Sequence, residues 1–157
     1  MAPASKRGST VSRDLALLIG RLALGAVFLA HGYQKVVDFG IAGVTQSFEG
    51  MGVPMAQIAA PVVSYVELVG GALLILGAFT PVVGLALAID MLVAALLVHV
   101  PQGVFVDQGG WELVGALGAG ALILAAVGPG RLSADALVLR RGRGRRSRSS
   151  AASTAAA

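Results

Sequence analysis

Three charged residues lie inside apolar runs that are long enough to cross a bilayer: Arg21, Glu67 and Asp90. A charged side chain at membrane depth is costly unless it faces the interior of a helix bundle and finds a partner. Intramembrane ionisable residues are therefore candidates for function. A structural clamp between helices is the alternative, and the sequence leaves both interpretations open.

The depth of these residues predicts which of them meet. A helix rises about 1.5 Å per residue, so Glu67 and Asp90 lie within roughly 3 Å of the middle of their runs, and Arg21 lies slightly to the cytoplasmic side. We expect Arg21 to face the bundle interior and to contact Glu67, Asp90 or both. Two carboxylates against one cation are unfavourable in low dielectric, so one carboxyl is expected to be protonated or hydrated.

A second polar cluster is predicted near the external ends of the runs, formed by His31, Lys35, His99 and Glu112. We expect these side chains to line a vestibule open to the outside. Two histidines at matched depth could ligate a haem or a metal, but without further ligand spacing they favour hydrogen bonding, so no metal site is predicted. In a regular helix His99 and Asp90, nine residues apart, project from opposite faces.

Composition places the chain among membrane proteins. Of its 157 residues 56% are hydrophobic and 13% are charged, whereas soluble domains carry about 25% charged residues. There is no cysteine, which excludes disulfides, thiolate ligands and dithiol redox chemistry in this chain. The basic residues are concentrated in the tails, so the positive net charge does not indicate a nucleic-acid partner.

Four apolar segments are long enough for spanning helices, which need about 17–25 residues. They run from about 14 to 33, 57 to 79, 82 to 100 and 111 to 127. Thr80-Pro81 predicts a tight hairpin between the second and third segments, and Gly128-Pro129-Gly130 ends the fourth. The predicted fold class is an all-α membrane protein, a bundle of four transmembrane helices.

Basic residues predict the orientation. Ten of the twelve lysines and arginines precede the first segment or follow the fourth, so both termini are expected in the cytoplasm and the protein in the plasma membrane. The predicted organisation is a disordered basic segment at 1–13, a transmembrane domain at 14–130 and a basic low-complexity tail at 131–157. The expected surroundings are the lipid bilayer.

Glycines predict where helices pack closely, because small residues let backbones approach. The candidates are Gly25, Gly32, Gly70, Gly71 and Gly115. The sequence leaves open whether the fourth helix uses its small residues within the bundle or in a homo-oligomer.

Several separated motifs resemble those of DoxX-family membrane proteins. The first helix carries Arg21, Gly25, Phe28, His31, Gly32 and Lys35; the second segment carries Gly52, Pro54, Glu67, Gly70, Gly71 and Gly77. The loop before the fourth helix carries His99, Pro101, Gly103, Phe105, Gly109, Gly110 and Glu112. The resemblance covers roughly residues 14–130, and Asp90 is not part of it.

The resemblance implies a four-helix bundle of the plasma membrane. Some DoxX-like proteins are subunits of thiosulfate:quinone oxidoreductases, and others are associated with membrane complexes containing superoxide dismutase and a thiosulfate sulfurtransferase. With no cysteine to relay sulfur or electrons, this chain would supply a quinone pocket or dock a soluble redox enzyme. No catalytic residue is assigned.

Three hypotheses follow. The first is a non-catalytic membrane subunit or adaptor of a redox or stress-response complex. The second is a quinone-interacting oxidoreductase subunit, with His31, Glu67 and His99 as hydrogen-bonding or proton-transfer groups. The third is a small transporter or proton-coupled permease that uses Arg21, Glu67 and Asp90.

Overall fold

Five α-helices make up most of the computed structural model, which describes residues 6–138, and no strand occurs within that range. Their bounds are α1 Lys6–Tyr33, α2 Gly40–Gly50, α3 Ala56–Leu76, α4 Thr80–Ala94 and α5 Glu112–Val127. The predictions made for residues 1–5 and 139–157 lie outside the described residues.

Two of the long helices continue into wider, π-helical turns. The turn η1 (Gln34–Asp38) follows α1, and the turn η2 (Ala95–His99) follows α4. Two short 3₁₀ turns, η3 (Val100–Gln102) and η4 (Val106–Gln108), form the connection to α5. A π turn places one extra residue in the helical path, and such turns occur frequently at functional sites.

Three helical stretches are long and apolar enough to cross a membrane: Val11–Asp38, Ala56–Leu76 and Thr80–Gln102. They correspond to the first three predicted segments. The fourth, α5, is apolar but has 16 residues, which gives a length of about 24 Å. The prediction of an all-helical membrane protein is therefore confirmed, with three candidate spans and one shorter apolar helix.

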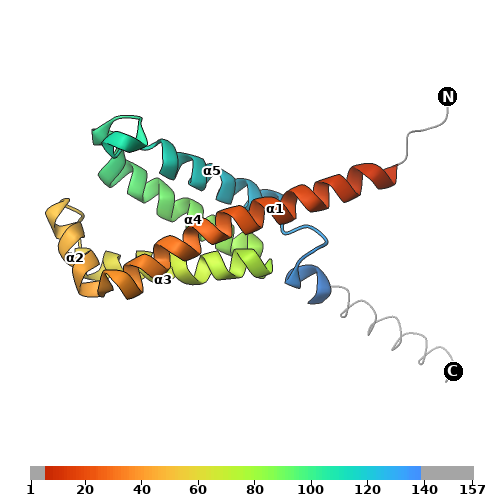
Figure 1. The fold of residues 1–157 in the computed structure, drawn as a ribbon, viewed down its shortest axis with the longest axis horizontal. Helices are drawn as coiled ribbons and strands as arrows, with labels where there is room; N and C mark the ends of the chain where they lie inside the picture. The colour runs from red at the N-terminus through yellow and green to blue at the C-terminus, as the bar shows by residue number, and fades with distance from the viewer. Residues whose placement is uncertain (1–5, 139–157) are drawn as a thin grey trace, which may run out of the picture.

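The helices pack as two close pairs, α1 with α3 and α4 with α5 (Figure 1). A smaller contact between α3 and α4 joins the pairs. The shared core contains Phe28 from α1, Leu74 from α3, Leu87 from α4, and Ala121 and Leu124 from α5. The polar residues predicted from the sequence can meet in the space between the two pairs.

Glycines set the close contact between α1 and α3. A Cβ on Gly32 would overlap the backbone nitrogen of Leu68, and a Cβ on Gly71 would overlap that of Leu29. A Cβ on Gly25 would lie 2.8 Å from the Gly71 carbonyl oxygen. The two helices are antiparallel, so these contacts fix their register: the middle of α1 faces the C-terminal end of α3, and the C-terminal end of α1 faces the middle of α3.

The other glycines serve different contacts. A Cβ on Gly70 would lie 3.1 Å from the Leu87 side chain, so this glycine admits α4 against α3. Gly115 was expected to pack helices together, but a Cβ there would meet the ring of Trp111 in the same chain segment, 2.9 Å away. Gly84, which the sequence analysis did not single out, lets α4 approach the backbone of α5 at Ala121.

Two segments outside the four predicted spans also contribute to the fold. The connection between the first and second spans, 34–56, contains α2, whose Val44 is buried. At the other end of the molecule, the segment 131–138 folds back onto the bundle (Figure 1), with Ser133 buried. The carboxylate of Asp135 accepts hydrogen bonds from the backbone N–H groups of Phe79 (2.9 Å) and Thr80 (3.1 Å), which lie at the start of α4.

Candidate functional site

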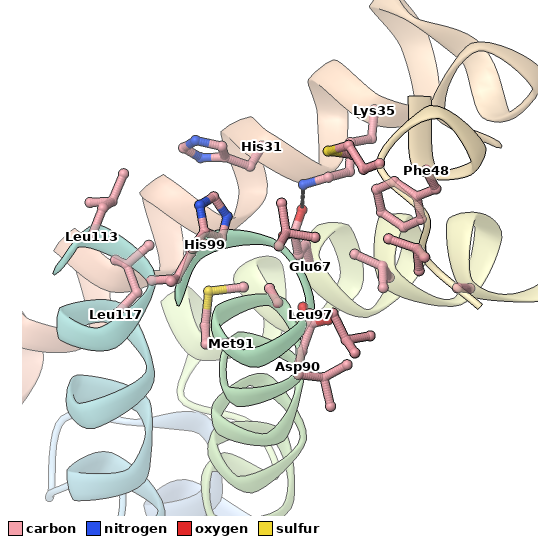
Figure 2. Close-up of a pocket in the computed structure, with 18 of the residues that line it drawn as sticks. His31, Lys35, Phe48, Glu67, Asp90, Met91, Leu97, His99, Leu113 and Leu117 are labelled. Atoms are coloured by element: carbon pink, nitrogen blue, oxygen red, sulfur yellow. Dashed lines mark hydrogen bonds and ion pairs between the residues drawn. The ribbon is translucent and has the colours of Figure 1, made fainter. Parts of the chain in front are cut away.

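A pocket of about 520 Å³ lies between the two helix pairs. Its walls are mostly apolar, and they include Phe28 together with Met91, Leu97, Leu113 and Leu117 (Figure 2). Five ionisable side chains also line it: His31, Lys35, Glu67, Asp90 and His99. The pocket therefore combines residues that the sequence analysis assigned to a midplane cluster with residues that it assigned to an outer vestibule.

Lys35 and Glu67 form an ion pair in the pocket (Figure 2), with Lys35 Nζ donating to Glu67 Oε2. The Glu67 side chain is 5% exposed and that of Lys35 is 20% exposed. The glycine contacts between α1 and α3 bring the C-terminal end of α1 and the turn η1 beside the middle of α3, which is why the partner of Glu67 is Lys35. The pair neutralises a carboxylate that would otherwise be buried alone.

Arg21 lies elsewhere, and the predicted contact with Glu67 or Asp90 is wrong. Its guanidinium is fully buried. Nη1 donates to the carbonyl of Leu74 at 3.3 Å, and Nη2 donates to the carbonyl of Leu132. The last carbonyls of a helix have no partner within the helix, and they carry the negative end of its dipole. Arg21 therefore binds the C-terminal end of α3 and the returning segment.

The cap of α3 is built around the same guanidinium. Gly77 follows α3 in a left-handed conformation, with φ of 66°. A Cβ at this position would overlap Arg21 Nη1. Glycine thus meets two requirements at once, because it adopts positive φ without strain and leaves room for the arginine.

Asp90 contributes a carboxyl group to the pocket from α4. Figure 2 shows this group directed toward the end of the pocket that holds Glu67. Its Oδ2 atom is buried, and within residues 6–138 no group donates a hydrogen bond to it. The predicted proximity of Glu67 and Asp90 is therefore found, with Lys35 in the place expected for Arg21.

His99 reaches the same pocket as Asp90 because of the π turn η2. In a regular helix the two side chains would project from opposite faces. The extra residue in η2 rotates His99 toward the pocket. Its Nδ1 lies 2.7 Å from the carbonyl oxygen of Gly109, and a carbonyl only accepts, so Nδ1 carries the hydrogen.

His31 lies near His99 at the same side of the pocket (Figure 2). Its Nδ1 is 2.9 Å from the carbonyl oxygen of Val27, one turn earlier in α1. By the same reasoning this nitrogen donates. A neutral imidazole with its Nδ1–H engaged has Nε2 as an acceptor. In the neutral ring of either histidine, Nε2 is therefore the acceptor nitrogen.

Glu112 does not line the pocket, which corrects its assignment to the outer cluster. Its Oε1 accepts a hydrogen bond of 2.7 Å from the backbone N–H of Val106. The backbone N–H of Glu112 donates to the carbonyl of Val104 at 3.0 Å. Together with the bond between His99 and Gly109, these contacts fold the loop before α5 on itself. Glu112 thus shapes the loop that positions His99.

Other pocket residues were not found from the sequence. Phe48, Met51, Val53 and Pro54 come from α2 and the segment after it. Their sequence gives no charge signal and only short apolar patches, so a closing element over the pocket was not predicted. The chemistry of the site is that of a ligand pocket: apolar walls with a small number of placed polar groups. Among the described residues, no group of three or more His, Asp or Glu side chains is arranged to hold a metal ion.

Comparison with known proteins agrees with this architecture. The DoxX family model matches residues 16–100. The inner membrane protein YphA of Escherichia coli is 31% identical over 130 residues, which cover 79% of this chain and 91% of YphA. The membrane protein Rv3486 of Mycobacterium tuberculosis is 35% identical over 125 residues, covering 73% of this chain and 76% of Rv3486.

A shorter match involves a protein of Bacillus subtilis named "Putative oxidoreductase CatD". It is 32% identical over 87 residues, which cover 55% of this chain and 62% of CatD. No solved structure matches the chain at comparable significance. The family match covers more than half of the chain and includes the pocket residues from His31 to His99. This chain belongs to the DoxX family of membrane proteins.

Proposed function

We propose that this protein binds a lipid-soluble quinone in the pocket between the two helix pairs, as the membrane subunit of a redox complex. The observation that carries this proposal is the pocket itself. About 520 Å³ of mostly apolar space, with ionisable groups at one side, suits an aromatic ring that bears polar oxygens. The printed name of CatD, an oxidoreductase, supports the redox assignment.

The proposed setting is the plasma membrane, with four spans and both termini in the cytoplasm. Large apolar side chains are exposed along the helices, among them Ile19, Leu22, Val62, Val69, Ile89, Leu92, Leu122 and Ile123. Such surfaces suit contact with lipid. The short helix α5 packs along α4, and a short apolar helix crosses a bilayer by local thinning of the lipid. The name of YphA, an inner membrane protein, supports the location.

A quinone entering the pocket would meet two kinds of surface. Phe28, Met91 and Leu117 offer apolar walls to the ring and the isoprenoid chain. The ion pair of Lys35 with Glu67, together with Asp90, offers hydrogen bonds to the ring oxygens. The chain has no cysteine, so the electrons would come from a soluble redox enzyme that docks on this subunit. A homo-oligomer is compatible with the same pocket.

The test is purification in mild detergent from a membrane that contains quinone, followed by lipid extraction and mass spectrometry. The proposal expects quinone in near-stoichiometric amount. It expects loss of the quinone in Lys35→Met combined with Glu67→Gln, a variant that removes the ion pair without leaving a charge. Quinone at the level of an unrelated membrane protein of similar size would contradict the proposal.

A small transporter or proton-coupled permease is the second candidate. The observation in its favour is that Lys35, Glu67 and Asp90 line one pocket and lie in the three stretches that are long and apolar enough to cross a membrane, because intramembrane ionisable groups mark substrate and proton pathways. Arg21, which this hypothesis included, binds backbone carbonyls outside the pocket. Proton-coupled uptake by the protein in sealed vesicles, with no quinone copurifying, would favour this candidate.

A further inference from the structure

The pocket contains one buried carboxyl oxygen for which no hydrogen-bond partner is found among the described residues. Asp90 Oδ2 is buried, and no donor reaches it from the described part of the chain. Buried polar atoms are nearly always hydrogen-bonded, and leaving one unpaired is costly. The unpaired oxygen belongs to a side chain that lines the pocket, so a bound ligand is a natural source of the donor.

The two histidines add further acceptors. His99 Nδ1 is engaged by the Gly109 carbonyl, and His31 Nδ1 by the Val27 carbonyl. In the neutral rings each Nε2 accepts. Asp90 Oδ2 is the buried acceptor of the pocket, whereas His31 is exposed and His99 is half-buried.

The ammonium group of Lys35, a hydrogen-bond donor in the pocket, already has a partner. Lys35 is the cation among the residues lining the pocket, and its ammonium group donates to Glu67. The ion pair of Lys35 with Glu67 leaves Asp90 as the carboxyl group of the pocket that has no ion-pair partner among the described residues. A ligand hydroxyl that donates to an ionised carboxylate forms a short, strong hydrogen bond.

We infer that the pocket binds the reduced, dihydroxy form of a quinone in preference to the oxidised form. This inference rests on the proposed function for the class of ligand. A hydroquinone carries two O–H donors, one of which matches the unpaired oxygen of Asp90. An oxidised quinone carries two carbonyl acceptors and would face Asp90 without a hydrogen between them. Asp90 is thus assigned as the acceptor of one ligand hydroxyl and as the residue that discriminates the two redox forms.

The experiment compares the affinities of decylubiquinol and decylubiquinone for the purified protein in lipid nanodiscs, under anaerobic conditions. A hydrogen bond to a charged group is worth about 1.5–3 kcal/mol, so the dissociation constant of decylubiquinol should be about tenfold lower or more. Asp90→Asn replaces one acceptor oxygen with a donor and should abolish or reverse the preference. The matched control is Asp107→Asn, in an exposed loop position outside the pocket, which should leave the preference unchanged.

The outcomes separate this inference from the proposal on which it rests. Equal affinities for the two forms, or tighter binding of decylubiquinone, would overturn the inference and leave quinone binding intact. A preference that survives Asp90→Asn would also overturn it, because the discrimination would then come from another group. Binding of neither form would overturn the proposed function as well. The comparison in the unsubstituted protein decides the matter even where the Asp90 variant does not fold.

Discussion

Arg21 and Leu132 are 111 residues apart in the sequence, and the guanidinium of Arg21 donates a hydrogen bond to the carbonyl of Leu132. The same side chain also donates to the carbonyl of Leu74 at 3.3 Å. One buried arginine thereby joins α1, the end of α3 and the segment that follows α5. Its position indicates a structural role, separate from the pocket.

Replacement of Arg21 should destabilise the protein. Arg21→Ala removes the hydrogen bonds of the buried guanidinium to the carbonyls of Leu74 and Leu132, and a hydrogen bond from a charged group is worth about 1.5–3 kcal/mol. The apparent melting temperature of the detergent-solubilised protein, followed by size-exclusion chromatography, measures the loss. Arg13→Ala, at an exposed position of the same helix, is the control and should have little effect. Equal stability of the two variants would show that Arg21 does not join these elements.

Removing one member of the ion pair should cost more than removing both. Lys35→Met leaves Glu67, whose side chain is 5% exposed, as an uncompensated buried charge, and such changes cost roughly 3–5 kcal/mol. Adding Glu67→Gln should recover most of the stability, measured by the same thermal assay. If the double variant is stable but no longer binds quinone, the pair is part of a working site. If binding returns with stability, the pair is only a clamp.

The α1–α3 contact should be sensitive to a single methyl group. In Gly32→Ala the new Cβ would overlap the backbone of Leu68, and overpacking of this kind costs about 1–3 kcal/mol. Gly20→Ala is the matched control on the same helix, because a Cβ there meets nothing within 4 Å. The control should be neutral or slightly stabilising, since alanine favours a helix over glycine. A reversed order of stabilities would contradict the described helix register.

The orientation in the membrane follows from the basic residues, ten of which lie before or after the helical bundle. Both ends are expected in the cytoplasm. A reporter that is active only outside the cytoplasm, fused after residue 157, should therefore give no activity. The same reporter inserted at Gln102, in the loop before α5, should be active. The opposite pair of results would overturn the proposed topology.

The sequence predicted the helical class and most of the helix bounds. Long apolar runs and the breaks at Thr80-Pro81 and at Gly128 are local signals, and they were sufficient for the three candidate spans and α5. The tertiary contact between Asp135 and the start of α4 was not predictable in this way. It depends on the return of the chain after α5, which no local pattern indicates.

The site was predicted in its members but not in its pairing. Placing each apolar run symmetrically in the bilayer put Arg21 near Glu67, although the two helices meet in a register that glycine contacts determine. Gly32 lies against Leu68, which brings Lys35 rather than Arg21 to Glu67. Arg21 lies in α1 and Lys35 in the turn η1 that follows it, so the prediction chose the right stretch of helix and the wrong cation.

The joint orientation of Asp90 and His99 could not be predicted because regular helical periodicity separates them. The π turn at Ala95–His99 changes that periodicity, and no residue type in it indicates an extra residue in the turn. Glu112 was misplaced for a related reason. Its depth matched that of His99, but its carboxylate binds the loop backbone at Val106 instead of facing the pocket.

The central claim is that a quinone occupies the pocket between the helix pairs, and photoaffinity labelling tests it most directly. A quinone carrying a photoreactive group on its ring, applied to the protein in nanodiscs and followed by peptide mass spectrometry, should label pocket residues such as Phe28, Met91 or Leu117. Excess unlabelled quinone should suppress that labelling. Labelling confined to lipid-facing residues such as Ile89 and Ile123, unaffected by competitor, would contradict the account.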